Sequence, residues 1–205
     1  VPSTHEADLS WAATGSTFDL HYKTASEANY TTIQGVTLND GVYTLSNLTE
    51  GTQYSWYIVT NCDDNTTFTS DVATFVTECE AIDSIPQTWN FDDNLYAGTS
   101  SYPLPVCWNR ISTSTSTLYP YSYNSSTYAH SGSRSLYFYN SYLNSLAIMP
   151  AIDNTILNIN DLQVSFYGRL STSNDNVRIV VGVMSDPSAD STFIPVDTIA
   201  FTNTQ

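Results

Sequence analysis

Short runs of alternating apolar and polar residues recur along the chain, and they constrain its fold more than any other feature. Phe18, Leu20 and Tyr22 alternate with polar neighbours, and residues 162–167 repeat the pattern far along the chain. Successive side chains of a β-strand point to opposite faces, so this period of two predicts half-buried strands. Amphipathic helical spacing of useful length does not occur. The sequence therefore predicts an all-β protein.

Turn-forming residues between these runs divide the chain into two expected domains. The 205 residues exceed the common single-domain size of about 100–150 residues. Between residues 8 and 77, short strands are expected at regular spacing, with Asn39-Asp40-Gly41 as a strong turn signal. We expect one β-sandwich over residues 1–79 and a second over residues 80–205.

The charge balance narrows the classes of partner. The formal net charge is −15, from 20 acidic and only 5 basic residues. Binding to a nucleic-acid backbone requires Lys and Arg to displace counterions, so no nucleic acid is expected as a partner, and anionic membranes are disfavoured for the same reason. No apolar run approaches the roughly 18 residues of a membrane span, so direct membrane insertion is not expected. The low share of charged residues, 12%, is common in extracellular β-proteins.

One stretch of the first domain matches a known motif. Residues 43–54, with the sequence YTLSNLTEGTQY, resemble the E-to-F corner of a fibronectin type III domain. The resemblance implies that Leu48 plugs the core, that the hydroxyl of Tyr54 returns to the backbone, and that Trp11 is a core tryptophan on strand B. Too few residues precede Trp11 for a full strand A, so we expect that strand to be short or missing.

Four blocks in the second domain follow one another in a recognisable order. They are WNFDD at 89–93, LPVCW at 104–108, HSGSRSL at 130–136 and VGVMSDP at 181–187. In order and spacing they resemble the cleaved-adhesin and MAM-like jelly rolls of bacterial secreted surface proteins. Because that family adds closing strands after the position of Gln205, we expect a C-terminal truncation. We also expect Val1 to begin a processed or excised fragment.

The three cysteines, Cys62, Cys79 and Cys107, leave one without a partner in any pairing. If the last two strands of the fibronectin-like domain form a hairpin, Cys62 and Cys79 lie at its opposite ends. A strand of eight residues spans roughly 26 Å, far more than the limit of about 7 Å between the Cα atoms of a disulfide. We predict the Cys79–Cys107 disulfide, with Cys62 free or bonded to a cysteine upstream of this sequence.

Two adjacent acidic residues are the candidate metal ligands. Asp92 and Asp93 follow an expected strand where related jelly rolls place a structural calcium ion. Ca²⁺ takes about six to eight oxygen ligands, and backbone carbonyls near Gly132 would supply some of them. The alternative is a solvated acidic turn. No other cofactor is expected.

Five tyrosines form the candidate ligand-binding surface. Tyr119, Tyr121 and Tyr123 share one side of an expected strand, and Tyr137 and Tyr139 share one side of another. Tyrosine rings on a flat sheet stack on sugar rings, while their hydroxyls pair with sugar hydroxyls. The alternative is that these large amphipathic residues serve only to cover half-buried faces.

Three triplets resemble the Asp-Ser/Thr-apolar O-glycosylation motif of some bacterial envelope proteins. Their acceptor residues would be Ser84, Ser191 and Thr198. Such triplets also arise by chance in a chain rich in Ser and Thr.

The sequence shows no sign of catalytic machinery. The histidines are scattered, and no Gly-x-Ser-x-Gly elbow, His-Glu-x-x-His motif or phosphate loop occurs. We expect a non-catalytic adhesin or binding segment of a larger secreted or cell-surface protein, with surface glycans or proteins of a host or neighbouring cell as partners. One alternative is a carbohydrate-binding appendage of a secreted glycoside hydrolase or peptidase. Another is a structural stalk or filament subunit that shares strands with neighbouring chains or domains.

Overall fold

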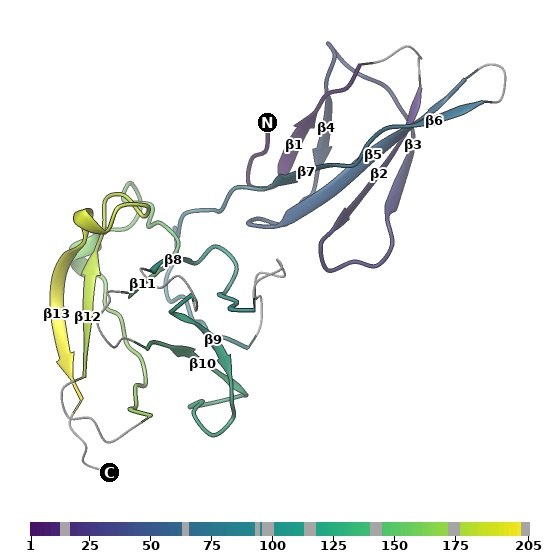
Figure 1. Ribbon diagram of the computed structural model, residues 1–205. Coiled ribbons are helices and arrows are strands. Elements are labelled where there is room, and N and C mark those ends of the chain that lie inside the picture. The colour runs from purple at the N-terminus through teal and green to yellow at the C-terminus, as the bar shows by residue number, and fades with distance from the viewer. Residues whose placement is uncertain are drawn as a thin grey trace. The chain divides into compact units, whose positions relative to one another are not determined.

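The computed structural model describes residues 1–12, 17–62, 66–92, 95, 101–112, 118–139, 145–171 and 177–201. Over these residues the chain is mostly β-structure in antiparallel sheets and contains no α-helix (Figure 1). It forms two compact units. The first is built mainly from residues 1–80, and the second from residues 81–95 and 101–205.

The first unit contains two antiparallel sheets. In the smaller one, β1 (Glu6–Leu9) pairs with β4 (Tyr43–Ser46). The larger sheet begins with β3 (Thr31–Val36), β2 (Phe18–Thr24) and β5 (Gln53–Asn61), in that order. The outer edge of β5 is shared by β6 (Thr67–Thr69) and β7 (Ala73–Val76), which pair with opposite ends of it.

Side chains from both sheets form one hydrophobic core. Phe18 and Leu20 are buried on the same face of β2, as the alternation predicts, and Leu20 has no exposed surface. Leu9 of β1 and Leu45 of β4 belong to the same buried cluster. Burial of a Leu or Phe side chain contributes about 1.5–3 kcal/mol relative to leaving it exposed. This cluster is therefore a main source of the stability of the first unit.

The predicted turn after β3 is present. Asn39 and Val42 form an antiparallel bridge, and the two residues between them, Asp40 and Gly41, have positive φ angles of 49° and 81°. Two successive residues in the left-handed region are the signature of a tight hairpin turn, for which Asp-Gly is a preferred sequence. This turn leads the chain directly into β4.

The corner before β5 is held by Tyr54. The phenolic oxygen of Tyr54 accepts a hydrogen bond from the backbone N–H of Thr49 at 2.9 Å. Leu48 is buried in the core beside it. These are the positions that the sequence predicts for Tyr54 and Leu48.

The second unit contains three two-stranded antiparallel sheets. The pairs are β8 (Asn109–Ser112) with β11 (Ser145–Ile148), β9 (Tyr121–Asn124) with β10 (Arg134–Tyr137), and β12 (Arg178–Val183) with β13 (Ile194–Ala200). Two short 3₁₀ turns, η1 (Ile159–Asp161) and η2 (Asp190–Thr192), lie outside the sheets. No helix among the described residues is long and apolar enough to cross a membrane.

The β12–β13 hairpin contains one irregularity. Its register shifts between Val181 and Gly182. A Cβ atom at position 182 would collide with the ring of Phe193 and the backbone oxygen of Ile194. The close approach of the two strands therefore requires a glycine at this position.

Two segments that the sequence predicts as strands join no sheet formed by the described residues. Residues 162–170 have no ladder partner among the described residues, and the side chain of Tyr167 is 78% exposed. Trp89 and Phe91 instead pack edge-on against Trp108, at ring-centroid distances of 5.4 and 5.6 Å. Alternation reports only the polarity of side chains, whereas a strand also needs a neighbour that satisfies its backbone groups.

Candidate functional site

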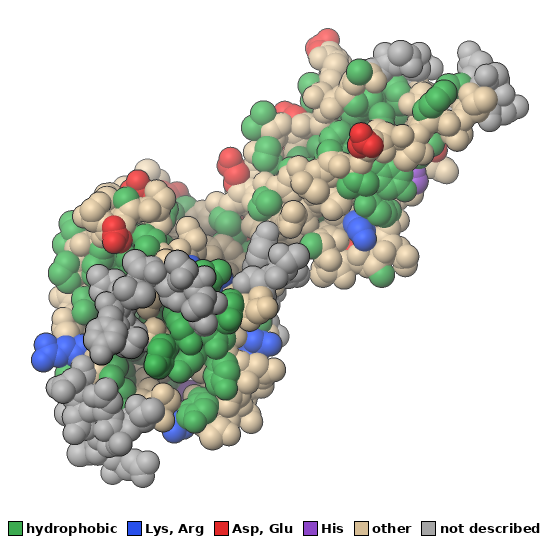
Figure 2. Space-filling model, viewed as in Figure 1, with side chains coloured by type: hydrophobic (Ala, Val, Ile, Leu, Met, Phe, Trp, Pro, Cys, Tyr) green, Lys and Arg blue, Asp and Glu red, His purple; other side chains and the backbone are tan. Residues whose placement is uncertain are grey.

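The β9–β10 hairpin brings together the five tyrosines that the sequence singles out. Tyr121 and Tyr123 lie two residues apart on β9 and therefore on the same face, and Tyr121 is directly opposite Tyr137 of β10. Tyr119 precedes β9, and Tyr139 follows β10. We refer to Tyr119, Tyr121, Tyr123, Tyr137 and Tyr139 as the tyrosine face. Hydrophobic side chains gather over this hairpin in Figure 2.

The rings of the tyrosine face are in continuous contact. Tyr119 is a hub, with its ring centroid 5.4 Å from that of Tyr139, 5.5 Å from Tyr121 and 5.6 Å from Tyr137. Tyr123 extends the contacts to the other end of the hairpin, 5.3 Å from Tyr137 and 6.1 Å from Tyr121. These separations lie in the range in which aromatic pairs stabilise one another. The five rings therefore act as one packed surface.

On the opposite face of the hairpin, the centre of β9 is buried. Ser122, between Tyr121 and Tyr123, is 1% exposed, and its hydroxyl donates a hydrogen bond to the backbone oxygen of Phe91 at 2.8 Å. The preceding Pro120 is also fully buried. Because one face of the strand is anchored in the second unit, the tyrosine side chains of β9 must lie on the other face.

Arginine side chains hold the backbone that carries the tyrosines. Arg110 donates three hydrogen bonds to backbone oxygens, at 2.6 Å to Tyr102, 2.8 Å to Leu118 and 2.9 Å to Pro120. Arg134 donates another at 3.0 Å to the backbone oxygen of Ser122. Hydrogen bonds from charged donors are stronger than neutral ones. These contacts fix the segment that leads into β9 before any ligand arrives.

Two phenol groups of the tyrosine face, those of Tyr121 and Tyr137, are held in their neutral form. Burial raises the pKa of Tyr121 and of Tyr137 above the ordinary value of 10.0, and the neighbouring Tyr119 raises both further. A neutral phenol both donates and accepts hydrogen bonds. The face can therefore offer flat apolar rings together with hydroxyl groups, which suits a ligand that itself combines flat carbon faces with hydroxyls.

The carboxylate of Asp92 stabilises the chain bend at Gly132 and Ser133. One of its carboxylate oxygens accepts hydrogen bonds from the backbone N–H of Ser133 at 2.8 Å and from the hydroxyl of Ser133 at 2.7 Å. These bonds lower the pKa of Asp92, the hydroxyl bond most of all. Gly132 has a φ of +65°, and a Cβ atom there would collide with the Asp92 carboxylate. The hydrogen bonds between Asp92 and Ser133 therefore depend on a glycine at position 132.

The predicted calcium site is only partly described. Asp93 lies outside the described residues, and no group of three or more His, Cys, Asp or Glu side chains suited to a metal ion occurs among those that are described. Asp92 would supply one carboxylate, and the backbone near Gly132 lies beside it. Calcium binding at Asp92 and Asp93 remains a prediction.

The cysteines pair as the sequence predicts. Cys79 and Cys107 form a disulfide, and Cys62 is a half-buried free cysteine. Disulfides form and persist in oxidising compartments. The predicted glycosylation acceptors Ser84, Ser191 and Thr198 are all exposed, in a loop, in η2 and in β13 respectively. Their modification remains a prediction.

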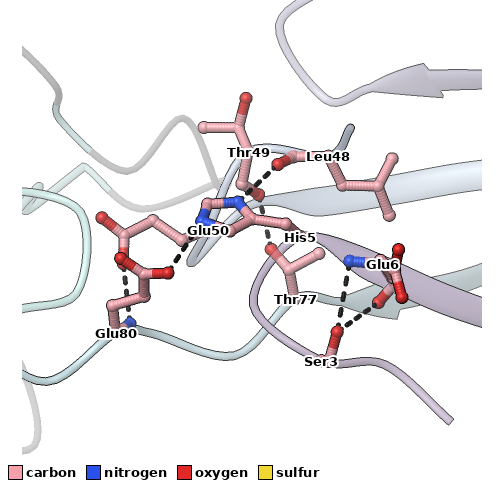
Figure 3. A network of polar contacts seen from close by, with 8 residues as sticks. All are labelled: Ser3, His5, Glu6, Leu48, Thr49, Glu50, Thr77 and Glu80. Atoms are coloured by element: carbon pink, nitrogen blue, oxygen red, sulfur yellow. Dashed lines mark hydrogen bonds and ion pairs between the residues drawn. The ribbon is translucent and has the colours of Figure 1, made fainter. Parts of the chain in front are cut away.

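The histidines have separate surroundings. In the first unit, Nδ1 of His5 lies 2.8 Å from the backbone oxygen of Leu48, and Nε2 lies 2.9 Å from Oε1 of Glu80 (Figure 3). His21 stacks on Tyr57 in the same unit. His130, in the second unit, stacks on Tyr167 with a centroid distance of 3.5 Å.

Some residues of the site have no strong signal in the sequence. Tyr102 and Tyr128 extend the tyrosine face, with ring centroids 5.1 Å from Tyr121 and 6.4 Å from Tyr123. Neither shares the period-two spacing of the other tyrosines. The role of Arg110 was also missed, because its partners are backbone oxygens, which no residue pattern identifies. Only the low number of basic residues, 5 in the chain, marks each arginine as a position worth attention.

Comparison with known proteins does not assign this chain to a family. A scan against protein-family models and a search of curated proteins found no match to this chain.

Proposed function

We propose that this chain is a non-catalytic binding segment of an extracellular or cell-surface protein, and that the tyrosine face is its ligand-binding surface. The main observation in support is that five tyrosines lie on one side of the β9–β10 hairpin with their rings in continuous contact. Glycans on the surface of another cell are the ligand class that suits this combination of flat rings and neutral hydroxyls.

In this proposal the first unit is a fibronectin type III-like spacer. The order β3-β2-β5 with β6 and β7, opposite the β1–β4 pair, supports it. So does the hydrogen bond between Tyr54 and Thr49, which corresponds to the tyrosine corner of such domains. We assign the second unit to the cleaved-adhesin or MAM-like jelly rolls on its sequence blocks. The disulfide supports an extracellular location.

A glycan array with matched variants tests the proposal. The full chain is expected to bind a subset of printed glycans with micromolar affinity, and Tyr121→Ala and Tyr139→Ala are expected to weaken binding about tenfold or more. Tyr139 is 56% exposed, so its removal should leave the fold intact. Tyr30→Ala in the first unit is the control, because Tyr30 is also half-buried and in ring contact.

Two results would contradict the proposal. One is an array on which the folded chain binds no glycan. The other is binding that Tyr30→Ala reduces as strongly as Tyr121→Ala and Tyr139→Ala do.

A second candidate is a structural stalk or filament subunit, favoured by the exposed apolar segment at residues 162–168. Val164, Phe166 and Tyr167 are 54%, 44% and 78% exposed, and an extended segment of this kind is suited to strand addition by another chain. Light scattering coupled to size-exclusion chromatography tests this function. A molar mass that rises with protein concentration, and that stays at the monomer value in Val164→Lys, would support this function. A monomer at all concentrations would contradict it.

A further inference from the structure

The ring contacts of the tyrosine face continue through Tyr128 to one arginine, Arg169. Tyr128 follows Tyr123 in the chain of ring contacts, and the guanidinium carbon of Arg169 lies 5.1 Å from the centroid of the Tyr128 ring. A further aromatic pair lies close by in the sequence. His130 comes two residues after Tyr128, and Tyr167, on which it stacks, comes two residues before Arg169. The contacts therefore run from Tyr139 through the hairpin to a cation stacked on an aromatic ring.

Arg169 is held in place and remains accessible. Its Nη1 donates a hydrogen bond to the backbone oxygen of Thr127 at 2.9 Å, and the residue is exposed. A guanidinium has five N–H donors in a planar fork, so most of its donors remain available to a ligand. No ion pair between Arg169 and a carboxylate occurs among the described residues.

The sequence around the tyrosine face is free of acidic residues. No Asp or Glu occurs between Asp93 and Asp153, although the chain has 20 acidic residues in all. The only Lys or Arg residues in that stretch are Arg110 and Arg134. Asp92 and Asp153 are the described acidic residues on either side of this stretch. Both accept hydrogen bonds from hydroxyl groups, and Asp92 also interacts with Arg134. In a chain of net charge −15, a segment free of acidic residues repels an anion less than the acidic parts of the chain do.

From these observations we propose that the ligand of the tyrosine face is an acidic oligosaccharide, with its sugar rings on the tyrosines and a carboxylate or sulfate group on Arg169. The inference rests on the proposed function and specifies its ligand class. An arginine fork matches the planar geometry of a carboxylate and donates two parallel hydrogen bonds to it. A neutral sugar would use the rings and leave the cation unused.

The test compares charged and uncharged forms of the same sugars. Suitable pairs are tetragalacturonate with its methyl ester, sialyllactose with its methyl ester, and a heparin tetrasaccharide with its desulfated, N-acetylated and carboxyl-reduced form. At least one acidic member should bind about tenfold or more tightly than its neutral counterpart. Its affinity should fall as salt is raised. Arg169→Gln should remove this preference, and Arg169→Lys should retain part of it.

Arg178→Gln is the matched control, because Arg178 is an exposed arginine on β12 and its loss changes the net charge equally. A circular dichroism spectrum of each variant checks the fold. Equal binding of acidic and neutral members, or equal effects of Arg169→Gln and Arg178→Gln, would overturn the inference and leave the proposed function standing. Failure of every sugar, acidic or neutral, would overturn both.

Discussion

The environment of His5 determines its charge. Both of its ring nitrogens face acceptors, the backbone oxygen of Leu48 and the carboxylate of Glu80. A neutral imidazole can donate from only one nitrogen, so both contacts are satisfied together only by the imidazolium form. Glu50 lies close enough to add to the negative field, and its carboxylate accepts a hydrogen bond from the backbone N–H of Glu80 at 2.7 Å.

We expect the pKa of His5 to lie above its ordinary value of 6.5, raised first by the hydrogen bond to Leu48 and then by Glu80. Because the folded pKa is raised, the stabilisation from these contacts is complete below about pH 6.5 and is lost as the pH rises through the folded value. Titration of the His5 ring resonances by NMR measures this pKa. Glu80→Gln should lower it, whereas Glu27→Gln, an equal charge change elsewhere in the unit, should not.

A His5 pKa at or below 6.5 would contradict this account. So would a Glu80→Gln variant that titrates at the same pH as the unchanged chain.

Among the strands, β2 and β5 lie at the centre of the core of the first unit. Leu20 of β2 is directly opposite Ile58 of β5, and both side chains are buried. Leu20→Ala would leave a cavity in this layer and is expected to reduce the free energy of unfolding by about 2–5 kcal/mol. Urea denaturation measures the change. Val72→Ala, at a position 57% exposed, should change it by less than about 0.5 kcal/mol.

Strands could be predicted from the sequence where alternating side-chain polarity coincides with pairing to neighbouring strands in the fold. Alternation identified β2 from Phe18, Leu20 and Tyr22 because that strand has neighbours on both edges. The same alternation failed at residues 162–167, where no strand in the described part of the chain supplies backbone partners. The spacing of Tyr121 and Tyr123 gave their shared face, since a period of two is intrinsic to a strand.

The rest of the candidate site could not be read from the sequence. The meeting of Tyr121 with Tyr137 depends on the register of β9 against β10, which arises from long-range packing. The hydrogen bonds of Arg110 are likewise a product of the fold, because its backbone acceptors are spread over residues 102–120. Local spacing carries no information about either.

For the whole molecule, the disulfide is the covalent restraint among the described residues. Reduction of Cys79–Cys107 is expected to lower the free energy of unfolding by about 2–4 kcal/mol, because it frees the loop between the two residues in the unfolded chain. Thermal melts with and without a reducing agent measure the effect. The background variant should be Cys62→Ser, so that the free cysteine cannot exchange with the bond. Identical melts under the two conditions would contradict the expectation.

The segment that joins no sheet has a consequence for handling the protein. Proteolytic nicking concentrates where backbone is accessible and weakly held, and residues 166 and 167 offer chymotrypsin two adjacent aromatic side chains that are 44% and 78% exposed. Brief digestion of the folded chain should therefore cut first after Phe166 or Tyr167, and mass spectrometry of the early products would identify the site. The cut would place Arg169 and the β12–β13 hairpin on a different polypeptide from the tyrosines, so in a preparation clipped at this point only noncovalent contacts, such as the hydrogen bond to Thr127, would keep Arg169 beside the rings.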